Sequence, residues 1–178
     1  ESDLTYYAIF EIRQYTITFK ETGESVIDPI TQDYNSAVVA PEDPVKTGYT
    51  FTGWADKNGN KVDVPATMPA EDITLKATWT VDQYTITFDM DGGDAIASIT
   101  QDYNTTVTAP ADPVKEGHKF EGWEPAVPAT MPAANTTVKA TWSKLSYTVT
   151  WVVPDQENQV DTVVYGDAIT APVPTKTG

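Results

Sequence analysis

Residues 83–123 read QYTITFDMDGGDAIASITQDYNTTVTAPADPVKEGHKFEGW, and residues 14–54 read QYTITFKETGESVIDPITQDYNSAVVAPEDPVKTGYTFTGW. The two stretches are identical at 25 of 41 aligned positions, at an offset of 69 residues. The match resumes at an offset of 63, from VPATMPAEDITLKATW, ending at Trp79, to VPATMPAANTTVKATW, ending at Trp142. The second copy therefore lacks six residues after the first tryptophan. Self-similarity at such a period is typical of tandem modules, so the repeat decides the fold.

A third copy begins at Tyr147 with YTVTW, continues through VVYGDAITAP and stops at Gly178, and residues 3–10, DLTYYAIF, match residues 72–79, DITLKATW. We therefore divide the chain into residues 1–13 (the closing strand of a preceding repeat plus a linker), 14–80 (repeat one), 81–143 (repeat two) and 144–178 (a truncated repeat three). This phasing leads us to expect a piece of a longer array. Because unpaired strand edges attract partners, we expect residues 4–10 to pair with repeat one or with a neighbouring molecule.

Each copy consists of short runs in which apolar and polar residues alternate. Tyr15, Ile17 and Phe19 alternate with threonines, and this period of two in β-branched and aromatic residues is typical of a half-buried strand. The closing stretch alternates in the same way, at Ile73, Leu75, Ala77 and Trp79. Glycine turns and 13 prolines separate the runs, and no stretch predicts a helix of 11 residues or more. The pattern predicts mainly β modules with little helix, joined by spacers of about four residues such as 80–83.

The composition excludes several classes of protein. The net charge of −15 argues against nucleic-acid binding, because neutralising phosphates needs clustered lysine and arginine. No apolar run approaches the roughly 18–20 residues of a membrane-spanning helix, so we expect no membrane insertion in this segment. The chain has no cysteine and one histidine, which excludes disulfides, cysteine-ligated zinc and a two-histidine metal site within one chain.

The candidates for catalysis all have simpler structural interpretations. The histidine, His118, has Tyr49 as its counterpart in repeat one, which favours a structural or surface aromatic over a general base. The recurring acids are interpreted as turn or capping residues, since a glycosidase needs two carboxylates facing each other across a cleft; they are Asp33, Asp102, Asp43 and Asp112. We therefore expect no catalytic residue, no cofactor-binding residue and no enzyme.

A second set of candidates concerns ligands. Asp89, Asp91 and Asp94 surround two glycines in DMDGGD, and clustered oxygens of this kind attract calcium, but a β-turn joining two strands explains the same residues. Residues 56–60, DKNGN, are a weaker case of the same kind, with an Asn-Gly hairpin signal. The regularly recurring aromatics favour core packing over a carbohydrate platform; they are Tyr15, Trp54, Trp79, Tyr84, Trp123 and Trp142.

The succession YTITF, a glycine-containing turn, VTAPADPVKEG, HKFEGW and VKATW resembles the Listeria–Bacteroides repeat, also known from internalin B-repeats. The third copy is also somewhat similar to mucin-binding-type surface repeats. The resemblance implies tandem small β-grasp (ubiquitin-like) modules, arranged as beads on a string, in a secreted or surface-anchored bacterial protein. It implies a non-enzymatic stalk or spacer of an extracellular protein, whose partners are neighbouring repeats.

An alternative is an adhesin module that binds a host protein or a glycan. Its binding patch would lie at the variable turns and at the exposed positions Thr50 and Thr52, with Lys119 and Glu121 as their counterparts in repeat two.

Overall fold

The computed structural model describes residues 4–152 and 157–173, and these residues form strands, turns and extended chain without a helix. The chain separates into two units, Glu1–Gln83 and Tyr84–Gly178. The prediction of tandem, mainly β modules is thereby confirmed. The narrower assignment to the β-grasp class stays a prediction.

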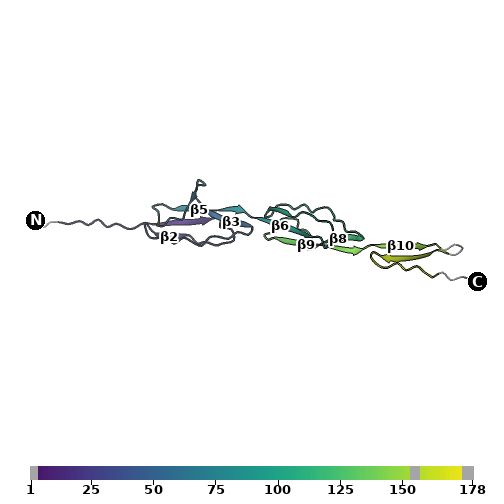
Figure 1. Ribbon diagram of the computed structural model, residues 1–178. Helices are drawn as coiled ribbons and strands as arrows, with labels where there is room; N and C mark the ends of the chain where they lie inside the picture. The colour runs from purple at the N-terminus through teal and green to yellow at the C-terminus, as the bar shows by residue number, and fades with distance from the viewer. Residues whose placement is uncertain (1–3, 153–156, 174–178) are drawn as a thin grey trace, which may run out of the picture. The chain divides into compact units, whose positions relative to one another are not determined.

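Unit one is built on a mixed five-stranded sheet (Figure 1). Its strands are β1 (Gln14–Lys20), β2 (Ile30–Asp33), β3 (Tyr49–Ala55), β4 (Lys61–Val62) and β5 (Ile73–Val81). The order across the sheet is β2-β1-β5-β3-β4, with β1 parallel to β5 and the other pairs antiparallel. The first and last strands of the repeat thus lie side by side in the middle of the sheet, with Ile17 opposite Ile73.

Unit two repeats this arrangement with one strand fewer. Its four-stranded sheet has the order β7-β6-β9-β8, from β6 (Gln83–Asp89), β7 (Ile99–Asp102), β8 (His118–Glu124) and β9 (Thr136–Lys144). The six residues missing from this copy are those that build the hairpin to β4 in unit one. The third copy forms an antiparallel two-stranded sheet of β10 (Ser146–Trp151) and β11 (Gln159–Val164).

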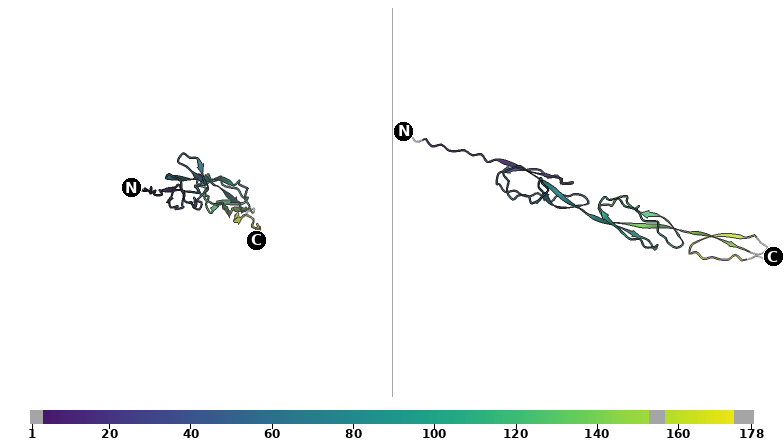
Figure 2. Two further views of the ribbon diagram at one scale, coloured as in Figure 1. Left: turned by 90° about the vertical axis from the view of Figure 1, so that its left-hand side faces the viewer. Right: turned by 90° about the horizontal axis from the view of Figure 1, so that it is seen from above.

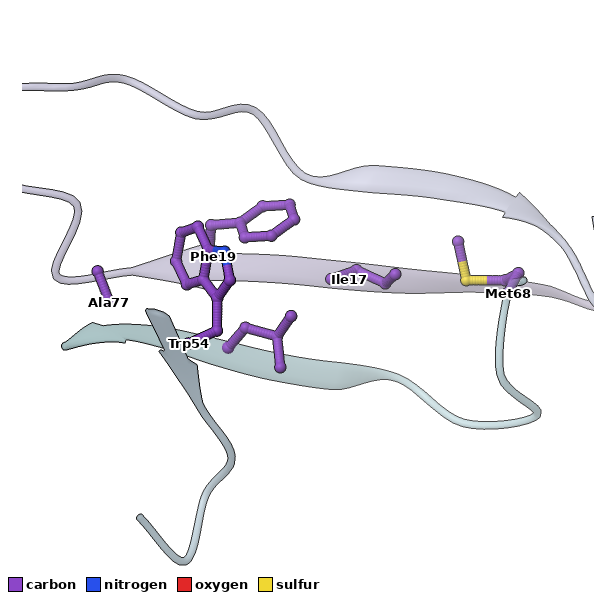
Figure 3. Close-up of a cluster of buried hydrophobic side chains, with 6 residues drawn as sticks. Ile17, Phe19, Trp54, Met68 and Ala77 are labelled. Atoms are coloured by element: carbon purple, nitrogen blue, oxygen red, sulfur yellow. The ribbon is translucent and has the colours of Figure 1, made fainter. Parts of the chain in front are cut away.

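The core of unit one is formed by side chains that point from β1, β3 and β5 to one face of the sheet, as the alternation predicts. Figure 3 shows this cluster, which consists of Ile17, Phe19, Trp54, Met68, Leu75 and Ala77. The corresponding cluster of unit two is Ile86, Phe88, Met90, Val107, Met131 and Val138. Four equivalent pairs are buried in both clusters: Ile17 and Ile86, Phe19 and Phe88, Met68 and Met131, and Leu75 and Val138.

Met68 and Met131 close these cores from the loop that precedes the last strand, and both side chains are almost completely buried. The backbone of Met68 is held by the turn after β2: its N–H donates to Ser36 O, and its carbonyl accepts from Asn35 N–H, each at 2.9 Å. Met131 repeats both bonds with Thr105 and Asn104. Sequence analysis missed this role, because a single methionine between prolines has no periodic pattern.

A β-bulge interrupts β3 at Gly53 and β8 at Gly122, where the register against the last strand shifts. The φ angles of 126° and 135° lie in a region that only glycine adopts without strain. Next to this bulge, the ring of Phe51 contacts Trp54 on the same strand and Trp79 on the neighbouring strand β5.

Two expectations are corrected. Residues 4–10 form no strand and extend from the sheet of unit one into solvent (Figures 1 and 2). Pairing with unit one is wrong because β5 already fills the place between β1 and β3; pairing with another molecule stays a prediction. The predicted spacer length of about four residues is also wrong. Strand β5 extends to Val81 and β6 begins at Gln83, so the spacer is the single residue Asp82.

Candidate functional site

The turn after β6 contains the candidate calcium ligands Asp89, Asp91 and Asp94. Asp91 has a φ of 47°, its N–H donates to Asp89 Oδ1 at 3.0 Å, and Gly93 N–H donates to Met90 O at 2.9 Å. The N–H of Asp94 donates to Val114 O at 2.9 Å, which ties the turn to the neighbouring loop. The three acids thus lie in a tight turn with its own hydrogen bonds.

Two lysines contact the oxygen atoms of Asp91 in this turn. Lys139 Nζ on β9 is 2.9 Å from Asp91 Oδ1, and Lys115 Nζ is 3.8 Å from Asp91 Oδ2 while donating to Asp91 O at 2.6 Å. The hydrogen bond and charge of Lys139 lower the pKa of Asp91, and Asp91 in turn raises the pKa of Lys139. In the part of the chain that the structure describes, no three metal-ligating side chains of the His, Cys, Asp or Glu type come together. Calcium binding stays the untested alternative to the turn, and the carboxylate of Asp91 is an ion-pair partner here.

The same connection between turn and last strand recurs in unit one with different residues. Lys76 on β5, the counterpart of Lys139, donates to Glu21 Oε1 at 2.9 Å. The indole N–H of Trp79 donates to Glu21 O at 2.9 Å, and that of Trp142 donates to Met90 O at 3.1 Å. This position in the repeat therefore links the first turn to the closing strand.

His118 lies at the start of β8, where its Nδ1 is 2.7 Å from Glu116 O. Its ring meets the edge of Tyr165 at a centroid distance of 5.8 Å. The recurring acids Asp33 and Asp102 begin turns, accepting through their carbonyls from Ser36 and Thr105. The structure thus brings His118 to an aromatic contact and places these acids in turns, as the structural interpretation predicted; Asp43 and Asp112 lie in the loops before Pro44 and Pro113.

The aromatic residues form a chain of ring contacts inside each unit. Phe51 contacts Trp54 at 5.3 Å and Trp79 at 5.5 Å, and Phe120 contacts Trp123 at 5.3 Å and Trp142 at 5.4 Å. Edge-to-face pairs at such distances add stabilisation beyond buried area. Core packing, the interpretation that the sequence favoured, agrees with these contacts.

Unit one has one feature that unit two does not share, the hairpin from β3 to β4. Asp56 Oδ1 accepts from the N–H groups of Asn58 at 2.8 Å and Asn60 at 2.9 Å, and Gly59 has a φ of 83°. The side-chain amide of Asn60, which donates to Asp56 Oδ2 at 3.1 Å, and then these backbone bonds lower the pKa of Asp56. The Asn-Gly signal thus predicted the hairpin correctly.

Beside this hairpin runs an open groove of about 510 Å³. Its apolar lining includes Val62, Ile73 and Leu75, and its acidic lining consists of Asp56, Asp63, Glu71 and Asp72, with Lys57 as the one cation among the lining residues. Sequence analysis missed the groove, although the six-residue insertion was a signal for it. The arrangement can accept a ligand with positive charge and aliphatic groups, since its lining combines carboxylates with apolar side chains.

The exposed positions proposed for a binding patch are partly engaged within the units. Lys119 Nζ is 3.0 Å from Glu121 Oε1, which also accepts from Ser143 Oγ at 2.6 Å. Thr52 Oγ1 donates to Thr78 Oγ1 at 2.9 Å. The described residues also contain no helix that is long and apolar enough to cross a bilayer.

Residues 15–78 and 84–141 match the Listeria-Bacteroides repeat domain. The chain belongs to the Listeria-Bacteroides repeat family. The two matched segments coincide with the two sheets described above, so each sheet is one Listeria-Bacteroides repeat.

The relatives of this chain are much longer proteins, and the similarity covers only a part of each. Internalin H of Listeria monocytogenes is 38% identical over 142 residues, which cover 73% of this chain and 25% of that protein. A candidate membrane protein of Evansella cellulosilytica is 35% identical over 123 residues, covering 68% of this chain and 18% of its own length. A candidate Gly-rich membrane protein of the same organism is 32% identical over 122 residues, covering 67% and 14%. The chain therefore spans a quarter or less of these relatives.

Proposed function

We propose that this chain is a non-enzymatic repeat region of a bacterial secreted or cell-surface protein, where it acts as a stalk or spacer. The family and the names of the relatives, an internalin and two candidate membrane proteins, support a surface location. The net charge of −15 supports the spacer role, because like charges keep modules soluble and repel one another.

One observation carries the proposal: the two repeats use shared positions to build the same kind of sheet and core. Equivalent residues pack the two cores, close them with a methionine and link the first turn to the last strand.

The spacer role is tested by small-angle scattering of the chain in solution at physiological salt. We expect a maximum dimension well above that of a globule of 178 residues. A globular radius of gyration would contradict the spacer role. The surface location is tested separately, by labelling intact cells of the source bacterium with antibodies against the repeats. Labelling that appears only after permeabilisation would contradict that location.

A second candidate function is adhesion to a host protein or glycan, and the groove of unit one favours it. Because the groove is lined partly by the hairpin that repeat two lacks, it offers a chemistry that a plain spacer does not need. The test compares the chain with a Glu71→Lys, Asp63→Lys variant on a glycan array and against immobilised host proteins. Both side chains line the groove and both are solvent-facing, so we expect the variant to fold and to lose any specific binding. Equal binding by both proteins, or binding by neither, would contradict adhesion through the groove.

A further inference from the structure

The hairpin of β10 and β11 has six residue pairs and no core of its own among the described residues, yet it is fixed to repeat two. The connection uses a single residue between β9 and β10, Leu145. Its N–H donates to Gly117 O, and its carbonyl accepts from Tyr165 N–H, both at 2.8 Å. One residue thus bonds to the start of β8 on one side and to the end of β11 on the other.

The ring of Tyr165 completes this joint. It packs against Gly117, where an added Cβ atom would collide with the ring carbons Cγ, Cδ1 and Cδ2, and it forms an edge-to-face pair with the ring of His118. Gly117 has a φ of 67° and is buried, so both the backbone and the available space require glycine. We call Gly117 and His118 the glycine corner.

Glu116 directly precedes this glycine, and its negative charge raises the pKa of Tyr165. Repeat two, which ends with β9, is therefore joined to the third copy through Gly117, Tyr165 and the linking residue Leu145.

Repeat one carries the second half of the same joint. Tyr34 occupies the position of Tyr165, and Arg13 that of Leu145; Tyr34 N–H donates to Arg13 O at 2.8 Å, as Tyr165 does to Leu145. The ring of Tyr34 stands edge-to-face on Tyr15 at 6.5 Å and is 53% exposed. Around it lies an open groove of about 470 Å³, lined by Glu11, Ile12, Arg13, Tyr15, Tyr34 and Ala70.

We propose that the exposed face of Tyr34 is a docking surface for the glycine corner of another module of this type. The partner is a repeat with a buried glycine, at the position of Gly117, followed by an aromatic residue. We infer this because Tyr165 already packs against such a glycine corner in this chain. A residue with a Cβ at that corner would collide with the ring, so the joint selects modules that carry the glycine. This inference deepens the proposed function, on which its biological role rests, by naming the surfaces through which repeats stack.

The joint is first tested in the chain itself by NMR. A glycine under a ring face has Hα signals shifted upfield, and we expect this for Gly117, together with nuclear Overhauser contacts to the Tyr165 ring. Tyr165→Ala should abolish both signals and let the hairpin tumble independently of repeat two, while Tyr165→Phe should keep them. The matched control is Val160→Ala, an exposed position on β11. Unchanged glycine signals in Tyr165→Ala would overturn the joint.

The docking surface is then tested in an extended chain in which residues 83–144 replace residues 1–12, directly before Arg13. We expect a second upfield-shifted glycine, from the added copy, with contacts to Tyr34. Tyr34→Ala should remove these signals and Tyr34→Phe should retain them; because Tyr34 is exposed in the original chain, the substitution leaves the fold of repeat one intact. Absence of the second signal, or its survival in Tyr34→Ala, would overturn the proposal. These results depend on neither surface labelling nor the overall dimensions, so the joint and the spacer role can fail separately.

Discussion

Replacing Met68 by alanine removes the side chain that closes the core of unit one. The methionine is 0% exposed, and it is held in place by two backbone hydrogen bonds that the substitution leaves intact. The variant therefore changes packing alone. Met131, at 1% exposure, is the same position in unit two, so the chain contains its own matched experiment.

The expected magnitude follows from burial. Truncating a fully buried methionine to alanine destabilises a domain by about 2–5 kcal/mol, through lost transfer energy and the remaining cavity. At about 4–8 °C per kcal/mol for a small domain, the midpoint of unit one should fall by roughly 10 °C or more. A small domain is stabilised by about 5–15 kcal/mol in total, so this is a large fraction.

The assay is hydrogen exchange read separately in the two sheets. Met68→Ala should speed exchange in β1 and β5 and leave β6 and β9 unchanged, whereas Met131→Ala should do the reverse. Met68→Leu, which keeps the volume, should lose less than about 1.5 kcal/mol. Equal destabilisation of both units by either variant would refute the view that each repeat has a separate core.

Three further predictions concern unit two. Gly122→Ala should cost about 1–3 kcal/mol in urea unfolding, because the φ of 135° is a glycine region and no atom lies within 4 Å of the added carbon, which leaves backbone strain as the cause. Trp142→Phe should cost about 1–3 kcal/mol in the same assay, since it removes the indole donor to Met90 O together with part of the ring. The pKa of Asp91 is lowered in the fold by Lys139, so this pair stabilises above the unfolded pKa of the carboxyl and its contribution disappears as pH falls through the lowered folded value. Asp91→Asn should therefore weaken the fall of the unfolding midpoint at acid pH. In the same test, adding calcium chloride should leave the unfolding midpoint of the unsubstituted chain unchanged. A rise of the midpoint with calcium would support the metal interpretation instead.

Local signals in the sequence were enough to predict the strands. The alternation of Tyr15, Ile17 and Phe19 placed β1, and the Asn-Gly dipeptide at Asn58 predicted the hairpin to β4. These signals are reliable because strand periodicity and turn conformation depend on neighbouring residues. The candidate site was predicted less well. The sequence marked Asp91 as a turn residue, with calcium binding as the alternative, but it gave no sign that Lys139, distant in sequence, lies 2.9 Å away.

By itself, the sequence determined that one small sheet is repeated, where most of its strands run and which strand side chains face its core. It could do so because repetition and alternation are written in consecutive residues. Only the tertiary structure decided which strands are neighbours: that β1 pairs with β5 in parallel, that residues 4–10 pair with no strand among the described residues, and that Tyr165 covers Gly117. Hydrogen-bonding edges are chemically alike in every strand, so the choice between them depends on how the whole chain closes around its core.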